Sequence, residues 1–171
     1  MKNRYLGKTG EDTYNAPIDF GVLTGTYITF DVATSGNVYA PVGDYEYSSG
    51  LIKSIYLELT STSLEGYLWI FSGPIDPPAQ NDFRNFTAEQ LEKFIGIIDI
   101  YIPSIGGPGF VPPPSNVVVR NPVVSPLSVQ LDLPYVLQPE SKGLYFVFVQ
   151  QVGYTYSAAA KVTGHFTLKR D

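Results

Sequence analysis

The sequence contains no cysteine, and this absence removes several kinds of chemistry. A chain without thiols forms no disulfide, no thiolate metal site and no cysteine nucleophile. Histidine is also scarce, since His165 is the only one. We therefore expect a protein that uses no metal and no cofactor.

Charged side chains are scarce as well. They make up 16% of the residues, whereas about 25% is typical of soluble domains. The net charge is −5, and the eleven Lys and Arg residues are scattered from Lys2 to Arg170. A nucleic-acid interface needs clustered basic residues, so we expect no direct nucleic-acid partner. Low charge combined with 14% aromatic residues predicts that neighbouring subunits cover part of the surface.

The chain lacks any apolar run that approaches the length of a membrane-spanning helix. Its first seven residues carry positive charge, but no apolar segment follows them, so we expect no secretory signal. These two observations predict a protein that is made in the cytoplasm and does not enter a membrane.

With 171 residues, the chain is long enough for one domain with its own hydrophobic core. Residues 1–20 are polar and contain glycine, so we expect an N-terminal arm there and a single domain over residues 21–171. The last strand pattern stops close to the C-terminus, which leads us to expect a complete domain.

Apolar residues recur mostly with a period of two, which is typical of strands. The run at residues 144–149 is apolar on both faces, as expected for a central strand. Residues 61–63 are predicted to connect two neighbouring strands tightly. The predicted strands cover residues 22–32, 37–40, 51–60, 64–71, 95–102, 116–120, 127–133, 144–152 and 161–169.

One short helix interrupts the strand pattern, and a capping box marks its start. The Thr87 hydroxyl can accept from the first amides of the helix, and Gln90, three residues later, can reach back to the amide of Thr87. Phe86 and Leu91 are spaced to close a hydrophobic staple around this box. β-Branched residues follow from Ile95 onward, so the helix is predicted at about residues 87–94.

Many strands and one helix predict an all-β protein, a jelly-roll-like antiparallel β-sandwich. Residues 104–115 include three consecutive prolines, which lack amide donors. We predict an extended loop with some polyproline character for this segment.

Catalytic patterns are weak in this sequence. His165 shares a strand face with Thr163, and no Gly-x-Ser-x-Gly motif offers it a serine nucleophile, so we interpret it as a surface or interface histidine. Glu58 and Glu65 flank the connection at 61–63 and could oppose each other across two strands, as paired carboxylates do in sandwich glycosidases. Solvent-facing strand carboxylates are far commoner than such pairs. We predict that the chain is not an enzyme.

The carboxylates in predicted loops do not have the pattern of a metal site either. Asp44 and Glu46 form one pair and Asp76 and Asp82 another, and both have oxygens of the kind that calcium binds. Neither pair has the spacing of a calcium-binding loop, so we predict no metal site here.

Tyrosines near predicted loops are stronger candidates. Such residues stack on sugar rings or fill protein interfaces, and the low charge and the arm favour interfaces. Trp69, by contrast, is predicted to be a core aromatic on a central strand. The candidate interface residues are Arg4, Tyr5, Tyr14, Tyr45, Tyr47, Phe110, Pro113, Tyr154 and Tyr156.

Residues 68–102 resemble a pattern found in small tailed-bacteriophage virion proteins. In that pattern a strand ends in a proline-containing loop, and a turn with Asp and Asn leads to a short acidic helix and an apolar strand containing glycine. The matching parts are LWIFS at 68–72, PPAQNDF at 77–83, the capped helix, and FIGII at 94–98.

The resemblance implies a non-enzymatic jelly-roll that decorates or cements a capsid, often as a trimer. Its partners would be the major capsid protein or other virion proteins, and its location the capsid surface of the virion. The arm 1–20 and the loop 104–115 are the expected contact segments. Two alternatives stay open: a carbohydrate-binding or fibre-tip module, and a component of the tail, neck or baseplate.

Overall fold

The structure is a computed structural model, and it describes residues 7–8, 13–34, 38–42, 49–59, 64–102, 117–118, 127–139 and 141–170. The expected loop 104–115 and half of the expected arm, residues 1–6 and 9–12, lie outside the described residues.

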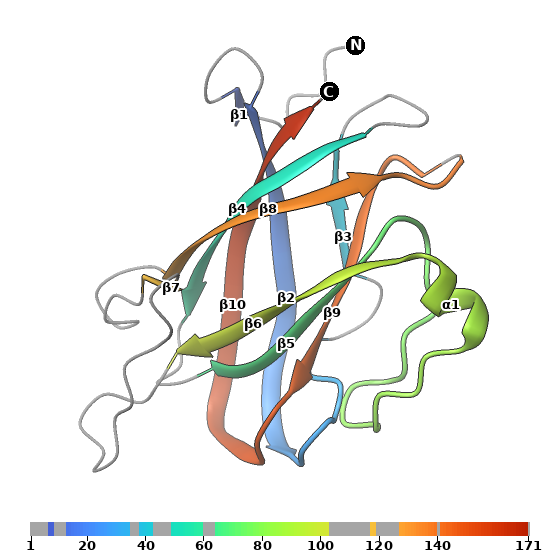
Figure 1. The fold of residues 1–171 in the computed structure, drawn as a ribbon. Helices are drawn as coiled ribbons and strands as arrows, with labels where there is room; N and C mark the ends of the chain where they lie inside the picture. The colour runs from blue at the N-terminus through green and yellow to red at the C-terminus, as the bar shows by residue number, and fades with distance from the viewer. Residues whose placement is uncertain are drawn as a thin grey trace.

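A six-stranded antiparallel sheet forms one layer of the fold (Figure 1). The strands β2 and β10 have 15 and 17 residues and pair along most of their length. Gly25 in β2 has a φ of 79°, a conformation that suits glycine, close to one of the register shifts in this pairing. The order of the sheet is β1 (Gly7–Lys8), β2 (Thr13–Tyr27), β10 (Tyr154–Arg170), β4 (Ser49–Leu59), β8 (Leu127–Val136) and β7 (Val117–Val118).

A four-stranded antiparallel sheet forms the second layer. The chain passes repeatedly from one sheet to the other: β2 and β4 belong to the first sheet, whereas β3 and β5 belong to the second. The two sheets pack as a sandwich, which confirms the predicted all-β antiparallel class, whereas the jelly-roll order stays a prediction. The order of this sheet is β3 (Val38–Pro41), β9 (Gly143–Gln150), β5 (Leu64–Phe71) and β6 (Phe94–Ile102).

The main core fills the space between the sheets. Phe146 and Phe148 of β9 point inward, and both rings lie within 6 Å of the ring of Phe20 on β2 (5.7 and 5.3 Å between centroids). Phe166 of β10 meets Phe146 edge to face at 6.0 Å. These rings are fully buried, so the two longest strands and the central strand β9 share one core.

A second apolar cluster covers the opposite face of the four-stranded sheet. Val147 and Val149 of β9 point into it, so β9 is buried on both faces, as its sequence predicts. The cover comes from the segment after β5. The outer cluster consists of Val32, Phe71, Ile75, Val147 and Val149, with Phe30, Trp69, Phe86 and Tyr145 packed against them.

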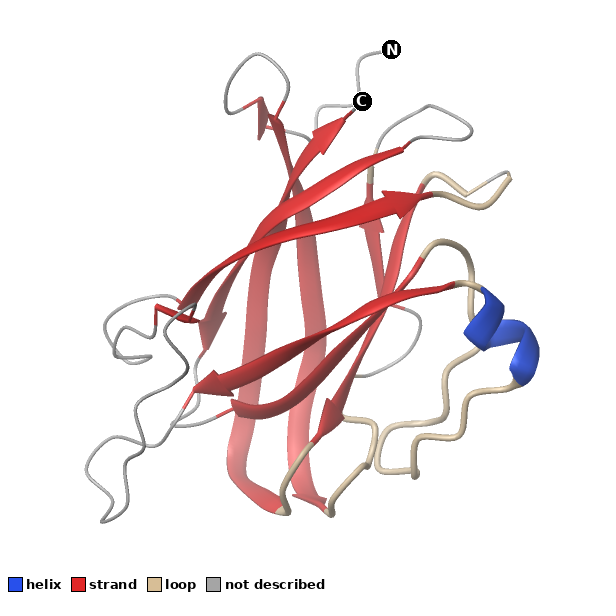
Figure 2. Cartoon of the chain, in the orientation of Figure 1, coloured by secondary structure: helices blue, strands red, loops and turns tan. Residues whose placement is uncertain are grey.

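The helix α1 (Ala88–Glu92) lies next to the start of β6 (Figure 2), and Phe86, just before the helix, packs on the outer cluster. The capping box is confirmed: the backbone amide of Gln90 donates to Thr87 Oγ1 at 3.2 Å, and the backbone amide of Thr87 donates to Gln90 Oε1 at 2.8 Å. Phe86 packs against Trp69 and Phe71, and Leu91 is 46% exposed, while the predicted staple between them stays a prediction.

The predicted boundary between arm and domain at residue 20 is wrong. Residues from Thr13 onward belong to β2, and Ala16, Ile18 and Phe20 are buried in the core. Pro17 is tolerated because β1 pairs only with Tyr14 and Asn15, which leaves Pro17 at an open edge of the described sheet.

Candidate functional site

The segment between β5 and α1 is anchored to the sandwich by the side chain of Gln80 and by backbone hydrogen bonds to Phe30 and Val32. Gln80 Nε2 donates to the carbonyl oxygens of Val22 and Ala33, both at 2.9 Å, and to the Tyr27 hydroxyl at 2.8 Å. Prolines occupy positions 74, 77 and 78, which have no amide donors and so favour an extended path. The result is a fixed loop that crosses the outer face of the four-stranded sheet.

The helix is tied to the same segment. Gln90 Nε2 donates to the carbonyl oxygen of Asp76, and Lys93 Nζ donates to that of Pro74 at 2.8 Å. The Ser72 amide also donates to the Lys93 carbonyl at 2.7 Å. These contacts hold α1 and the proline-rich segment at a defined separation.

A groove of about 840 Å³ lies between the loop and the helix. Its apolar part consists of proline rings, Ile75 and the ring of Phe83, which is 59% exposed. The capping-box residues Thr87 and Gln90 form part of its wall. The remaining lining residues are Pro74, Asp76, Pro77, Pro78, Asp82, Asn85, Glu89 and Lys93.

The groove is acidic. Asp76, Asp82 and Glu89 contribute three carboxylates, against the single ammonium group of Lys93. Lys93 Nζ lies 3.6 Å from a Glu89 carboxylate oxygen, in addition to its bond to the Pro74 carbonyl. The lining therefore has a formal charge of −2, and it favours a cationic occupant.

An apolar patch lies next to the helix, on the edge strand of the four-stranded sheet. Phe94 and Ile97 are 37% and 45% exposed, and Trp69 of the neighbouring strand lies between them. The Trp69 ring centroid is 5.2 Å from that of Phe94, and Trp69 is the register partner of Ile97. We call Phe94, Ile97 and Trp69, together with the exposed Leu91 three residues before Phe94 in the chain, the β6 patch.

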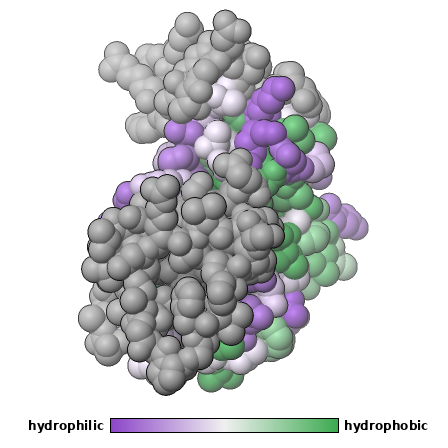
Figure 3. Space-filling model, turned by 60° about the vertical axis from the view of Figure 1, so that its left-hand side comes forward, coloured by the Kyte–Doolittle hydropathy of each residue, from purple (hydrophilic) through white to green (hydrophobic). Residues whose placement is uncertain are grey.

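Figure 3 shows one face of the molecule coloured by hydropathy. Green hydrophobic residues gather along its right-hand side, with purple hydrophilic residues above and below them. Exposed patches of this kind are typical of surfaces that other proteins cover.

A polar cluster lies on β4 and β10 of the six-stranded sheet. The His165 ring stacks on that of Tyr56 at 4.9 Å, and the Tyr56 hydroxyl donates to Glu58 at 2.6 Å. This hydrogen bond raises the pKa of Tyr56. Burial lowers the pKa of His165, and the charge of Glu58 partly opposes that effect. His165 is therefore half-buried on a sheet face, beside an aromatic ring.

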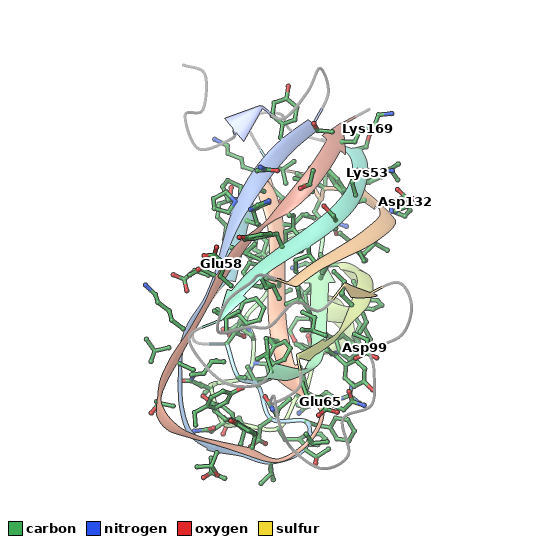
Figure 4. All side chains as sticks on the ribbon, turned by 90° about the vertical axis from the view of Figure 1, so that its left-hand side faces the viewer. Lys53, Glu58, Glu65, Asp99, Asp132 and Lys169 are labelled. Atoms are coloured by element: carbon green, nitrogen blue, oxygen red, sulfur yellow. The ribbon has the colours of Figure 1, made fainter. Side chains whose placement is uncertain are left out.

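The predicted opposition of Glu58 and Glu65 is wrong, as Figure 4 shows. Glu58 lies on β4 of one sheet and Glu65 on β5 of the other. Glu65 instead lies near Asp99 on the adjacent strand β6. Burial and, secondly, the charge of Asp99 raise the pKa of Glu65.

The two predicted carboxylate pairs have different outcomes. Asp76 and Asp82 both line the groove, whereas Asp44 and Glu46 lie outside the described residues. Within the described part of the chain, no three His, Asp or Glu residues group closely enough to hold a metal ion.

The candidate interface residues are only partly described. Tyr14 and Tyr154 are half-buried on β2 and β10. Tyr156 is not an exposed loop residue, because it lies within β10, is 4% exposed and packs edge to face on Tyr27 at 5.7 Å. Outside the described residues lie Arg4, Tyr5, Tyr45, Tyr47, Phe110 and Pro113.

Trp69 is central in its sheet, as predicted, but it faces the outer cluster rather than the main core. The guanidinium of Arg84 lies 5.1 Å from the Trp69 ring centroid and 4.8 Å from that of Phe30. The residues of the β6 patch other than Trp69 were not predicted as surface residues. Strand alternation places Ile97 on the face of β6 that points away from the buried Ile98, and this alternation is the sequence signal for an exposed Ile97.

In comparisons with known proteins, the chain matches no family model, no curated protein and no solved structure. Among the described residues, no helix is both long and apolar enough to cross a membrane.

Proposed function

We propose that the chain is a structural subunit of a tailed-bacteriophage particle, which decorates the capsid and binds several capsid subunits. The observation that carries this proposal is the β6 patch. It lies entirely within residues 68–102, the stretch that resembles small virion proteins, and it presents apolar side chains on a rigid strand and helix.

A decoration protein acts through buried area rather than through chemistry. A stable interface buries about 800 Å² on each partner, with apolar side chains at its centre and polar ones at its rim. Phe94 and Ile97 are suited to that centre, because β5 and the capped helix hold them in place. Contacts to several capsid subunits at once then add up through multivalency.

The proposal includes the major capsid protein as partner, a homotrimer as the assembled form and the capsid surface as location. Direct nucleic-acid binding is not part of it, because the net charge is −5. Tail, neck or baseplate components are the alternative if the protein binds another part of the particle.

Co-sedimentation with capsids of the source phage, stripped of decoration, tests the proposal. We expect Ile97→Ser to weaken binding roughly tenfold or more, because it removes an apolar anchor from the interface. Val136→Ser is the matched control: Val136 is 65% exposed, but it lies on β8 of the other sheet. Equal binding by both variants, or no binding by the wild type, would contradict the proposal.

Carbohydrate binding is the second candidate. Tyr39 on β3 is exposed, and its ring lies 5.2 Å from that of Tyr145 on β9, so two aromatic faces adjoin on one sheet. Glycan-array binding that Tyr39→Ala abolishes and Ile97→Ser leaves unchanged would favour this function over capsid decoration.

A further inference from the structure

The acidic groove is a concave surface next to the β6 patch, and it is lined by different residues. Its volume of about 840 Å³ lies within the range of about 300–1,000 Å³ that is usual for binding sites. Prolines and the exposed Phe83 ring are the apolar part of its lining, and three carboxylates belong to the same lining. An occupant that fits this chemistry has cations and apolar side chains along a short extended chain.

One segment of this chain has that composition. Residues 1–6 read MKNRYL, with Lys2 and Arg4 on either side of Asn3 and with Tyr5 and Leu6 following. The first acidic residue of the chain is Glu11. The segment has two cationic side chains and no anionic one, which complements a groove lining of formal charge −2.

We propose that the groove binds residues 1–6 of a second copy of this chain. Lys2 and Arg4 pair with the groove carboxylates, while Tyr5 and Leu6 pack on the proline rings and Phe83. The contact is directional, because one copy provides the segment and the next provides the groove. Contacts of this head-to-tail kind form a ring such as a trimer when the rotation between copies closes, and an open filament when it does not.

The geometry of β2 favours a second copy over the same one. Gly7 pairs with Asn15, whereas Gln80 anchors the groove loop at Val22, further along β2. Seven strand residues span about 23 Å, while six extended residues reach about 20 Å. Figure 1 shows β1 at one end of the sandwich, with α1 and the loop well away from it.

Each arm contact is expected to be weak and sensitive to salt. Exposed ion pairs contribute little individually, and salt at about 0.5 M screens them within a few ångströms. A closed ring compensates, because every copy both gives and receives an arm. The assembled form should therefore persist at low ionic strength and dissociate at high ionic strength.

Light scattering of the full chain over a hundredfold concentration range, at about 0.05 M and about 0.5 M NaCl, measures this assembly. We expect an oligomer at low salt for the wild type. Arg4→Glu and Glu89→Lys should each weaken association about tenfold or more, because each puts like charges together. The double variant restores opposite charges and should recover the oligomer.

Glu92→Lys is the matched control, since Glu92 lies on the same helix but does not line the groove. It should keep the wild-type mass. A monomeric wild type at all concentrations, an unchanged mass in Glu89→Lys, or equal dissociation in Glu92→Lys would overturn the proposal.

A synthetic peptide provides a test that needs no variant of the protein itself. A synthetic peptide of residues 1–6, added in excess to the wild-type protein, should dissociate the oligomer. A peptide with Glu at positions 2 and 4 should have no effect. If the oligomer persists with the first peptide, or if both peptides act equally, the groove does not bind this segment.

Discussion

The two sheets of the sandwich differ in how many faces they bury. β9 of the four-stranded sheet has Phe146 and Phe148 in the main core and Val147 and Val149 in the outer cluster, so both of its faces are covered. β10 of the six-stranded sheet buries Phe166 but leaves its other face polar. The groove and the β6 patch both belong to the doubly covered sheet.

The difference shows how an added layer creates a surface for binding. The main core joins strands through fully buried rings, and it should determine global stability. The outer cluster is smaller, and Gln80, the capping box and Lys93 hold its cover in place. Regions of this kind open locally at lower free energy than the core does.

The largest expected effect is in the main core. Phe148→Ala removes a fully buried ring that stacks on Phe20. We expect the free energy of unfolding to fall by about 3–5 kcal/mol. Urea denaturation measures it, and a loss below about 1 kcal/mol would mean that this ring is not part of the global core.

The next largest effect is expected at Gln80, which anchors the loop that covers the outer cluster. Gln80→Ala removes three hydrogen bonds and leaves the Val22 and Ala33 carbonyl oxygens without this donor. We expect a loss of about 1–3 kcal/mol and faster amide exchange in the loop than in β9. Gln151→Ala, in the turn before β10, is the control and should change stability by less than about 0.5 kcal/mol.

A smaller effect is expected at the helix cap. Thr87→Ala removes the oxygen that accepts from the Gln90 amide and should cost about 1 kcal/mol. Thr87→Ser keeps that oxygen and should restore most of the loss. Thermal unfolding of the two variants compares them, and equal melting temperatures would show that the cap contributes nothing.

The smallest expected effect is on the polar face of the six-stranded sheet. Burial lowers the pKa of His165 below its ordinary value of 6.5, so the unfolded chain binds a proton more readily than the folded one does. Stability should therefore be constant above that value and fall as the pH drops below it. His165→Gln should flatten this fall in pH-dependent denaturation, whereas an unchanged slope would contradict the assignment.

Local patterns in the sequence predicted local structure well. The Thr87 and Gln90 capping box depends on residues three positions apart, and it forms as expected. The inward and outward alternation of His165 and Phe166 also follows from strand geometry alone. Such features need no knowledge of distant partners.

Three predictions that required a particular distant partner failed. Glu58 and Glu65 were placed on one hairpin because a short stretch separates them, but β4 pairs with β10 and β8, while β5 pairs with β9 and β6. Residues 13–20 were assigned to an arm because residues 1–20 are polar and contain glycine, but they belong to a strand whose partner is β10. The buried Tyr156 was misplaced for the same reason, since its ring packs on Tyr27.

The sequence by itself determined the all-β class, the central strand β9 and the capped helix, because alternation and capping act between near neighbours. Only the tertiary structure decided which sheet face the proline-rich segment covers, and hence where the groove and the β6 patch lie. Gln80 shows the reason: its hydrogen bond to Val22 joins residues 58 positions apart. Contacts at that distance form only once the sheets have assembled.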